Sequence, residues 1–171
     1  GYLQSGKSIA SLKKLVSDAG ISLVDCIGFP TWMAQDEAKS KVGFVQMEKE
    51  MGLLAELGCT RVAAPAIGTD APLDLFRAGE RYKQLLDLGR KTGVMPQLEF
   101  WGAFPAFFHL SQALAVAAAA DDPDAKILAD VYHLFRGGSG FEGLKLVDGN
   151  AISIFHLNDF SGSIPRTEQQ D

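Results

Sequence analysis

The stretch ISIFHLND, residues 152–159, decides how the rest of the chain is interpreted. It is a short apolar run that carries His156, a side chain able to bind a divalent metal. Two earlier stretches have the same design: PQLEFW contains Glu99, and KILADVYH contains Asp130. The intervals from Glu99 to Asp130 and from Asp130 to His156 are each about the length of one βα unit. This spacing predicts three neighbouring parallel strands with one candidate ligand near the end of each.

In a (β/α)₈ barrel the carboxyl ends of the strands form one face, where the βα loops converge and active sites are built. Taken alone, a Glu, Asp or His at a strand end is more often a loop cap or a hydrogen-bonded surface group. Three of them in order on successive strands favour a metal site made by Glu99, Asp130 and His156. Carboxylate and imidazole ligands suit Mn²⁺, Mg²⁺, Co²⁺ or Zn²⁺, and ligand softness alone does not choose among these ions.

Helical and strand patterns alternate along the whole chain, which favours parallel βαβ units with right-handed crossovers. Helical periodicity places Val45 and Phe76 on packing faces of their helices. Gly58 and Gly93 are expected to end these helices, and Pro65 to mark the end of strand pairing. No Gly-rich dinucleotide motif or P-loop follows any strand. The expected helices are 8–19, 41–57, 76–91, 109–120 and a short piece at 141–147, and the five expected strands are 21–27, 60–64, 95–100, 127–130 and 151–157.

Composition limits the class of protein. With 171 residues, 47% of them hydrophobic, the chain can bury a sizeable core. No apolar run of about 18 residues predicts a membrane span, and the first residues lack the regions of a signal peptide, so a cytoplasmic protein is expected. A formal charge of −5 without a Lys/Arg cluster argues against nucleic acid as a partner. Cys26 and Cys59 lie in apolar context and are expected to be reduced core residues.

The motifs QLEFW, ADVYHLFRGG and IFHLNDF, in this order and spacing, resemble the xylose isomerase-like TIM-barrel family, often called sugar phosphate isomerases/epimerases. The resemblance runs from residue 21 to Asp159 and implies a (β/α)₈ barrel. Members of the family bind one divalent metal ion through Glu, Asp, His and a second Glu. The first three positions correspond here to Glu99, Asp130 and His156.

The second Glu of the family would stand on a strand beyond Asp159. Glu168 is the remaining candidate, and its segment SIPRTEQQD has no strand pattern. A complete barrel takes about 250 residues. Residues 1–171 are therefore expected to form one partial barrel domain with about five strands, a fragment in which 160–171 is a loop or a disordered tail.

The same resemblance implies substrate contacts. His133 matches the last position of the family's Asp-x-x-His pattern, where the imidazole contacts substrate. Arg166 is a possible match to an Arg that follows the His-x-x-Asp stretch near the substrate. Many relatives have a polar residue where this chain has Trp101, which implies a more apolar substrate wall.

Two further assignments stay open at this point. Asp159 can orient His156 or bind substrate. Trp32 and Phe29, in the loop GFPTW, can wall a substrate pocket or pack beneath the loop.

The function implied is a divalent-metal-dependent sugar or polyol isomerase/epimerase, which transfers a proton next to a carbonyl through a metal-stabilised enediolate. Glu99 and its missing counterpart would act as base and acid, and His133 would hold a substrate oxygen. A keto-inositol dehydratase would use the same enediolate to expel a β-hydroxyl. The alternative from another class is a barrel that binds a sugar or a protein without turnover. A related DNA-repair endonuclease is disfavoured because such enzymes need many His ligands and this chain has three. A homo-oligomer is possible.

Overall fold

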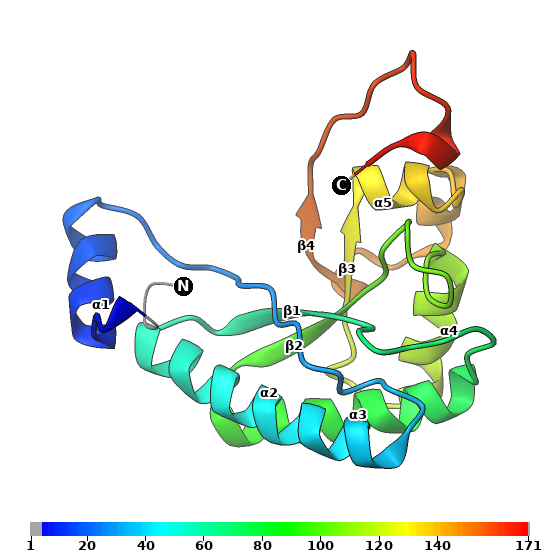
Figure 1. Ribbon diagram of the computed structural model, residues 1–171. Coiled ribbons are helices and arrows are strands. Elements are labelled where there is room, and N and C mark those ends of the chain that lie inside the picture. The colour runs from blue at the N-terminus through cyan, green and yellow to red at the C-terminus, as the bar shows by residue number, and fades with distance from the viewer. Residues whose placement is uncertain (1–4, 171) are drawn as a thin grey trace.

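In the computed structural model, which describes residues 5–170, four strands form a parallel sheet in chain order (Figure 1). They are β1 (Arg61–Pro65), β2 (Met95–Glu99), β3 (Ile127–Asp130) and β4 (Ile152–His156). The helices are α1 (Ile9–Asp18), α2 (Glu37–Leu57), α3 (Leu75–Thr92), α4 (Leu110–Ala120) and α5 (Val131–Arg136), with the 3₁₀ helices η2 (Glu142–Leu146), η3 (Gly149–Ala151) and η4 (Arg166–Glu168). Helices α2, α3 and α4 cover one side of the sheet, as in a barrel opened along its length (Figure 1). Within residues 5–170 no helix is both long and apolar enough to cross a membrane.

The expected strand at 21–27 is wrong except at its end. Ile27 makes a single parallel bridge to Ala63. The Gly28 N–H donates to the Ala63 carbonyl at 2.9 Å, and the Ala63 N–H donates to the Cys26 carbonyl at 2.7 Å. Earlier in the segment Ile21 and Val24 are exposed, so little apolar burial holds those residues in register with β1.

Helix boundaries follow their caps. The Asp36 carboxylate accepts the Lys39 N–H at the start of α2, four residues before the expected start of that helix. Gly58 and Gly93 adopt left-handed backbone at φ 83° and 78° and end α2 and α3, as the sequence predicts. Asp74 caps α3 at its first turn.

Two predicted packing positions are corrected. The side chains of Val45 and Phe76 are 71% and 81% exposed. The buried side of α2 instead carries Gly43 and Met47, because the small residue lets the backbone of the preceding loop approach the helix. Periodicity identifies apolar positions but not the face that finds a partner.

Strand register brings the three predicted ligands to one edge of the sheet. Pro65, at the end of β1, pairs with Glu99 at the end of β2. Asp130 pairs with His156 at the ends of β3 and β4. Between them, Glu99 pairs with Leu128, two residues before Asp130. The carboxyl ends of these parallel strands therefore carry Glu99, Asp130 and His156 at one edge of the sheet.

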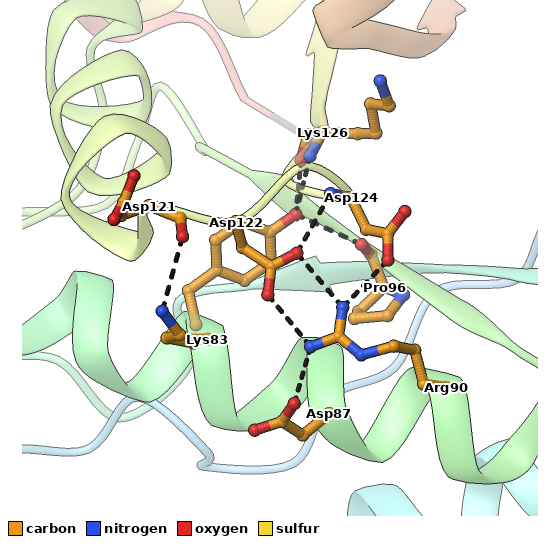
Figure 2. Close-up of polar contacts among 9 residues, drawn as sticks. Lys83, Asp87, Arg90, Pro96, Asp121, Asp122, Asp124 and Lys126 are labelled. Carbon is orange, nitrogen blue, oxygen red and sulfur yellow. Dashed lines mark hydrogen bonds and ion pairs between the residues drawn. The ribbon is translucent and has the colours of Figure 1, made fainter.

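Polar contacts fasten the opposite end of the strands (Figure 2). Arg90 in α3 makes ion pairs with Asp87, Asp122 and Asp124 at 2.6–2.9 Å. The buried Tyr82 hydroxyl donates to the carbonyl of Lys126 at 2.6 Å. These contacts tie α3 to the segment that connects α4 with β3.

The segment 160–170, expected as a loop or tail, folds back against α5. The Arg136 Nε–H donates to the Gln169 carbonyl at 3.1 Å. The buried Gln169 amide in turn donates to the carbonyls of Ser161 and Ile164. Residue 171 lies outside the described residues.

Candidate active site

Glu99, Asp130 and His156 converge from the ends of three adjacent strands. His156 Nδ1 lies 3.6 Å from Asp130 Oδ2 and 4.0 Å from Glu99 Oε1. The two carboxylate side chains are 2% and 3% exposed, whereas the imidazole is 32% exposed. The cluster is therefore closed on the carboxylate side and open beside the imidazole.

The two carboxylate oxygens of Asp130 have different roles: one caps a helix, and the other faces the candidate metal site. Oδ1 caps α5, where it accepts the backbone N–H groups of Tyr132 at 2.7 Å and His133 at 3.3 Å. Oδ2 faces His156 and accepts the Asn158 side-chain amide at 2.5 Å. Because the backbone bonds fix the carboxylate plane, Oδ2 has a defined position for a ligand.

Glu99 is held in surroundings that disfavour its charge. The pKa of its carboxyl group is raised to about 7, chiefly by burial and also by the nearby charges of Asp130 and Asp25, while the Trp101 side chain, within hydrogen-bonding reach, opposes the rise. Glu99 Oε2 is buried and has no hydrogen-bond partner among the described residues. A buried carboxylate without a partner costs stability unless a cation or a proton compensates it.

The residues fit a divalent metal ion in the kind of ligand atoms that they offer. Within residues 5–170, no group of three His, Cys, Asp or Glu side chains stands closely enough to hold an ion without adjustment. Ligand atoms around such an ion lie about 3.0–3.4 Å apart, slightly closer than the 3.6 and 4.0 Å seen here. Two carboxylates and one imidazole suit Mn²⁺, Co²⁺ or Zn²⁺, and Glu99 Oε1 faces the imidazole.

A cavity of about 300 Å³ opens beside the cluster. Trp101 is its aromatic centre: the indole stacks on the His133 ring at 5.4 Å and meets Phe104 at 5.0 Å and Phe29 at 5.9 Å between ring centroids. This volume is at the lower end for small-molecule sites. The lining residues are Trp101, Tyr132, His133, Asn158, Asp159 and Gln170.

Of the two roles open for Trp32, a substrate wall or packing beneath the loop, the structure shows packing. The Trp32 side chain is completely buried, and the indole N–H donates to the Pro65 carbonyl at 3.0 Å. The ring packs against Tyr82 in the core. The two aromatics of the loop thus separate, because Phe29 faces Trp101 while Trp32 turns under the sheet edge.

Two other predicted residues have different placements. Asp159 lines the cavity, and its Oδ1 accepts the Phe160 N–H at 2.8 Å. Arg166 is not among the residues that line the cavity; its guanidinium donates to the Arg136 carbonyl at 2.6 Å. Arg166 therefore braces the loop after α5 and does not reach the ligand cluster here.

Sequence reasoning missed three polar residues beside the site. Asn158 orients Asp130 and follows His156 by two positions in a polar stretch. Asp25 is a carboxylate inside an apolar run, and burial raises its pKa while His156 lowers it. Gln97 is buried two residues before Glu99, on the same side of β2. A charged or amide residue within an apolar strand-like run was the available signal for Asp25 and Gln97.

The structure is part of a (β/α)₈ barrel, because its parallel strands follow chain order and its helices cover one side of the sheet. The carboxylate and imidazole groups lie at the carboxyl ends of the strands, on the face where barrel active sites are built. The profile of the xylose isomerase-like TIM barrel family matches residues 2–168, and the chain belongs to this family. The family and the fold expected from the sequence are confirmed.

Solved structures agree on the fold. The IolI protein with a zinc atom superposes with a TM-score of 0.84 at 22% identity, over 96% of this chain and 61% of that one. The 3-keto-D-glucoside 4-epimerase YcjR from E. coli gives 0.74 at 20% identity, over 88% and 64%. D-psicose 3-epimerase, solved in the presence of D-fructose, gives 0.73 at 18% identity, over 88% and 57%. The chain thus spans about three fifths of the length of these proteins. Sequence comparison with curated proteins finds no significant match.

Proposed function

We propose that this chain provides the metal and substrate groups of a divalent-metal-dependent sugar or polyol isomerase/epimerase. The observation that carries the proposal is the convergence of Glu99, Asp130 and His156 at 3.6–4.0 Å on the face where barrel enzymes build their sites. The similarity of the chain to barrels that were solved with zinc or are named as sugar epimerases supports the same reaction class. The fourth ligand is not assigned to a residue of this chain.

The reaction class requires a proton to be moved at a carbon next to a carbonyl. A bound divalent ion supplies Lewis acidity toward the carbonyl and hydroxyl oxygens of the substrate. Glu99 takes the proton on its carboxylate. Asp130 and His156 would hold the ion, and the Asn158 amide fixes the Asp130 carboxylate.

The cavity has two chemically different walls. The Trp101 ring, stacked on His133, offers an apolar surface to the C–H face of a sugar. Asn158 and Asp159 provide polar groups on the lining for hydroxyls. His133, which is buried in α5 and lines the cavity, would hold a substrate oxygen. This combination suits a small polyol with one apolar face, and dehydration of a keto-inositol is the close variant of the same chemistry.

Metal titration of the native full-length protein tests the proposal first. Isothermal calorimetry with Mn²⁺, Co²⁺ and Zn²⁺ should detect one site, weakened at least about tenfold in Glu99→Gln and His156→Ala because each removes a ligand. His109→Ser is the matched control, since His109 caps α4 and serine preserves a cap.

Proton exchange then tests catalysis. A screen of keto sugars in D₂O by NMR should show metal-dependent exchange of the hydrogen next to the carbonyl, abolished by Glu99→Gln. Metal binding that is indifferent to both ligand changes would overturn the site. Tight metal and sugar binding without exchange would mean a binding barrel instead of an isomerase.

A further inference from the structure

Both the backbone and the ring of Trp101 are held by contacts with neighbouring residues. It follows Glu99 by two residues, just beyond the end of β2. Its backbone N–H donates to the Phe107 carbonyl at 3.2 Å, and its carbonyl accepts the Phe104 N–H at 2.9 Å. The ring is packed against Phe29, Phe104 and His133. Backbone and ring together leave the indole little freedom to rotate.

The polar end of this fixed ring is buried. Trp101 Nε1 is buried and has no hydrogen-bond partner among the described residues, and the same is true of Glu99 Oε2. A buried indole N–H usually finds an acceptor. The Trp101 side chain also stands within hydrogen-bonding reach of the Glu99 carboxyl group. An unused donor and an unused acceptor thus belong to residues that stand two positions apart in the chain.

We infer that Trp101 is a positioning residue: its indole N–H donates to the Glu99 carboxylate and holds one oxygen, so that the other stays directed at His156 and Asp130. The inference deepens the proposed function and rests on it for the role of Glu99. A Glu side chain has several rotatable bonds, and fixing one oxygen against a rigid ring removes much of that freedom at the moment of ligand binding. The ring remains part of the cavity wall, while the N–H holds the carboxylate of Glu99.

The hydrogen bond can be tested without any metal. In ¹H–¹⁵N spectra of the metal-free protein, the two tryptophans give two indole N–H signals, and Trp101→Phe identifies one of them by its loss. Glu99→Leu should move the Trp101 signal upfield and speed its exchange with water. The Trp32 signal is the internal control, because its N–H is bonded to the Pro65 carbonyl and should stay in place. An unmoved Trp101 signal would overturn the inference, whatever the protein does with metals.

The positioning role is tested by metal affinity. Trp101→Phe keeps an aromatic ring against Phe104 and His133 but removes the N–H, and it should weaken Mn²⁺ binding about tenfold, as loss of an outer hydrogen bond to a ligand does. Phe104→Leu is the matched control, since it alters the packing of the ring and leaves the N–H. It should change affinity less than about twofold.

Combining the changes separates coupling from general damage. If Trp101 acts through Glu99, Trp101→Phe should cause no further loss of affinity in the Glu99→Gln background. In turnover, Trp101→Phe should lower kcat with little change in KM, because the apolar wall is retained. Additive losses, or wild-type affinity in Trp101→Phe, would show that the indole N–H does not position Glu99. Absence of metal binding in the wild type would instead refute the proposed function, and the NMR result would still decide the hydrogen bond.

Discussion

Glu99→Gln should stabilise the metal-free protein, although it removes a group proposed for catalysis. The pKa of Glu99 rises from its ordinary value of 4.5 to about 7, chiefly through burial. The folded protein therefore holds this proton more tightly than the unfolded chain does. Stability from this group is complete below pH 4.5 and is lost as the pH rises to about 7. Each unit of pKa difference corresponds to about 1.4 kcal/mol, so the loss in the wild type amounts to about 3 kcal/mol. Glutamine resembles the protonated acid and does not ionise, so the variant does not lose this stability as the pH rises.

Urea unfolding followed by circular dichroism, with a chelator present, measures this difference. At pH 4 the wild type and Glu99→Gln should unfold at similar urea concentrations. At pH 8 the midpoint of the variant should be higher by about 1.5 M, for a slope of about 2 kcal/mol per molar urea. Glu56→Gln, at an exposed position of α2, is the control and should follow the wild type at both pH values. Parallel pH profiles for the wild type and Glu99→Gln would refute the reasoning, because the buried carboxylate would then carry no ionisation cost.

Other changes test how the scaffold holds the site, each by thermal and urea unfolding. Gly43→Ala should lower the free energy of unfolding by about 1–3 kcal/mol, because a Cβ there would lie 2.4 Å from the backbone of the preceding loop. Gly52→Ala in the same helix is the control: its Cβ would meet nothing within 4 Å, and the variant should be more stable by up to about 1 kcal/mol. Tyr82→Phe should cost about 1–3 kcal/mol, since it leaves the Lys126 carbonyl without its buried donor; an unchanged midpoint would mean that water replaces the hydroxyl. Arg90→Ala should lower the Tm more at low than at high ionic strength, because it removes an exposed ion-pair network. A salt-independent loss would point to packing instead of charge.

Local chemistry explains how much of the fold could be predicted. Gly58 and Gly93 end their helices because a left-handed residue closes the last turn, and this depends on the glycine alone. The strand at 127–130 matched its expected range because a short buried apolar run between polar residues has few alternatives. The strand at 21–27 failed because a strand exists only through hydrogen bonds to a neighbour, and just one bridge to β1 forms. That information is tertiary and is not present in the local pattern.

The candidate site divides in the same way. The spacing of Glu99, Asp130 and His156 predicted their convergence, because one βα unit advances the chain by one strand and returns it to the same face. The fate of Trp32 could not be predicted, since both aromatics of its loop are equally apolar and only the path of the backbone sends one to the core. Asn158 was missed because its role depends on the direction of a side chain two residues after β4.

Buried polar groups without partners gather around one part of this fold. Gln97 and Glu99 lie on the same side of β2, and Asp25 and Trp101 carry further buried atoms that lack hydrogen bonds within residues 5–170. Barrel interiors are usually filled by branched apolar side chains, and each such polar group costs stability. Folded proteins retain these costs mainly where a site uses the groups. The proposed function therefore links the two kinds of experiment: replacement of Glu99 should raise the stability of the metal-free protein and weaken its affinity for the metal. A group that was merely buried by accident would change the first quantity and leave the second alone.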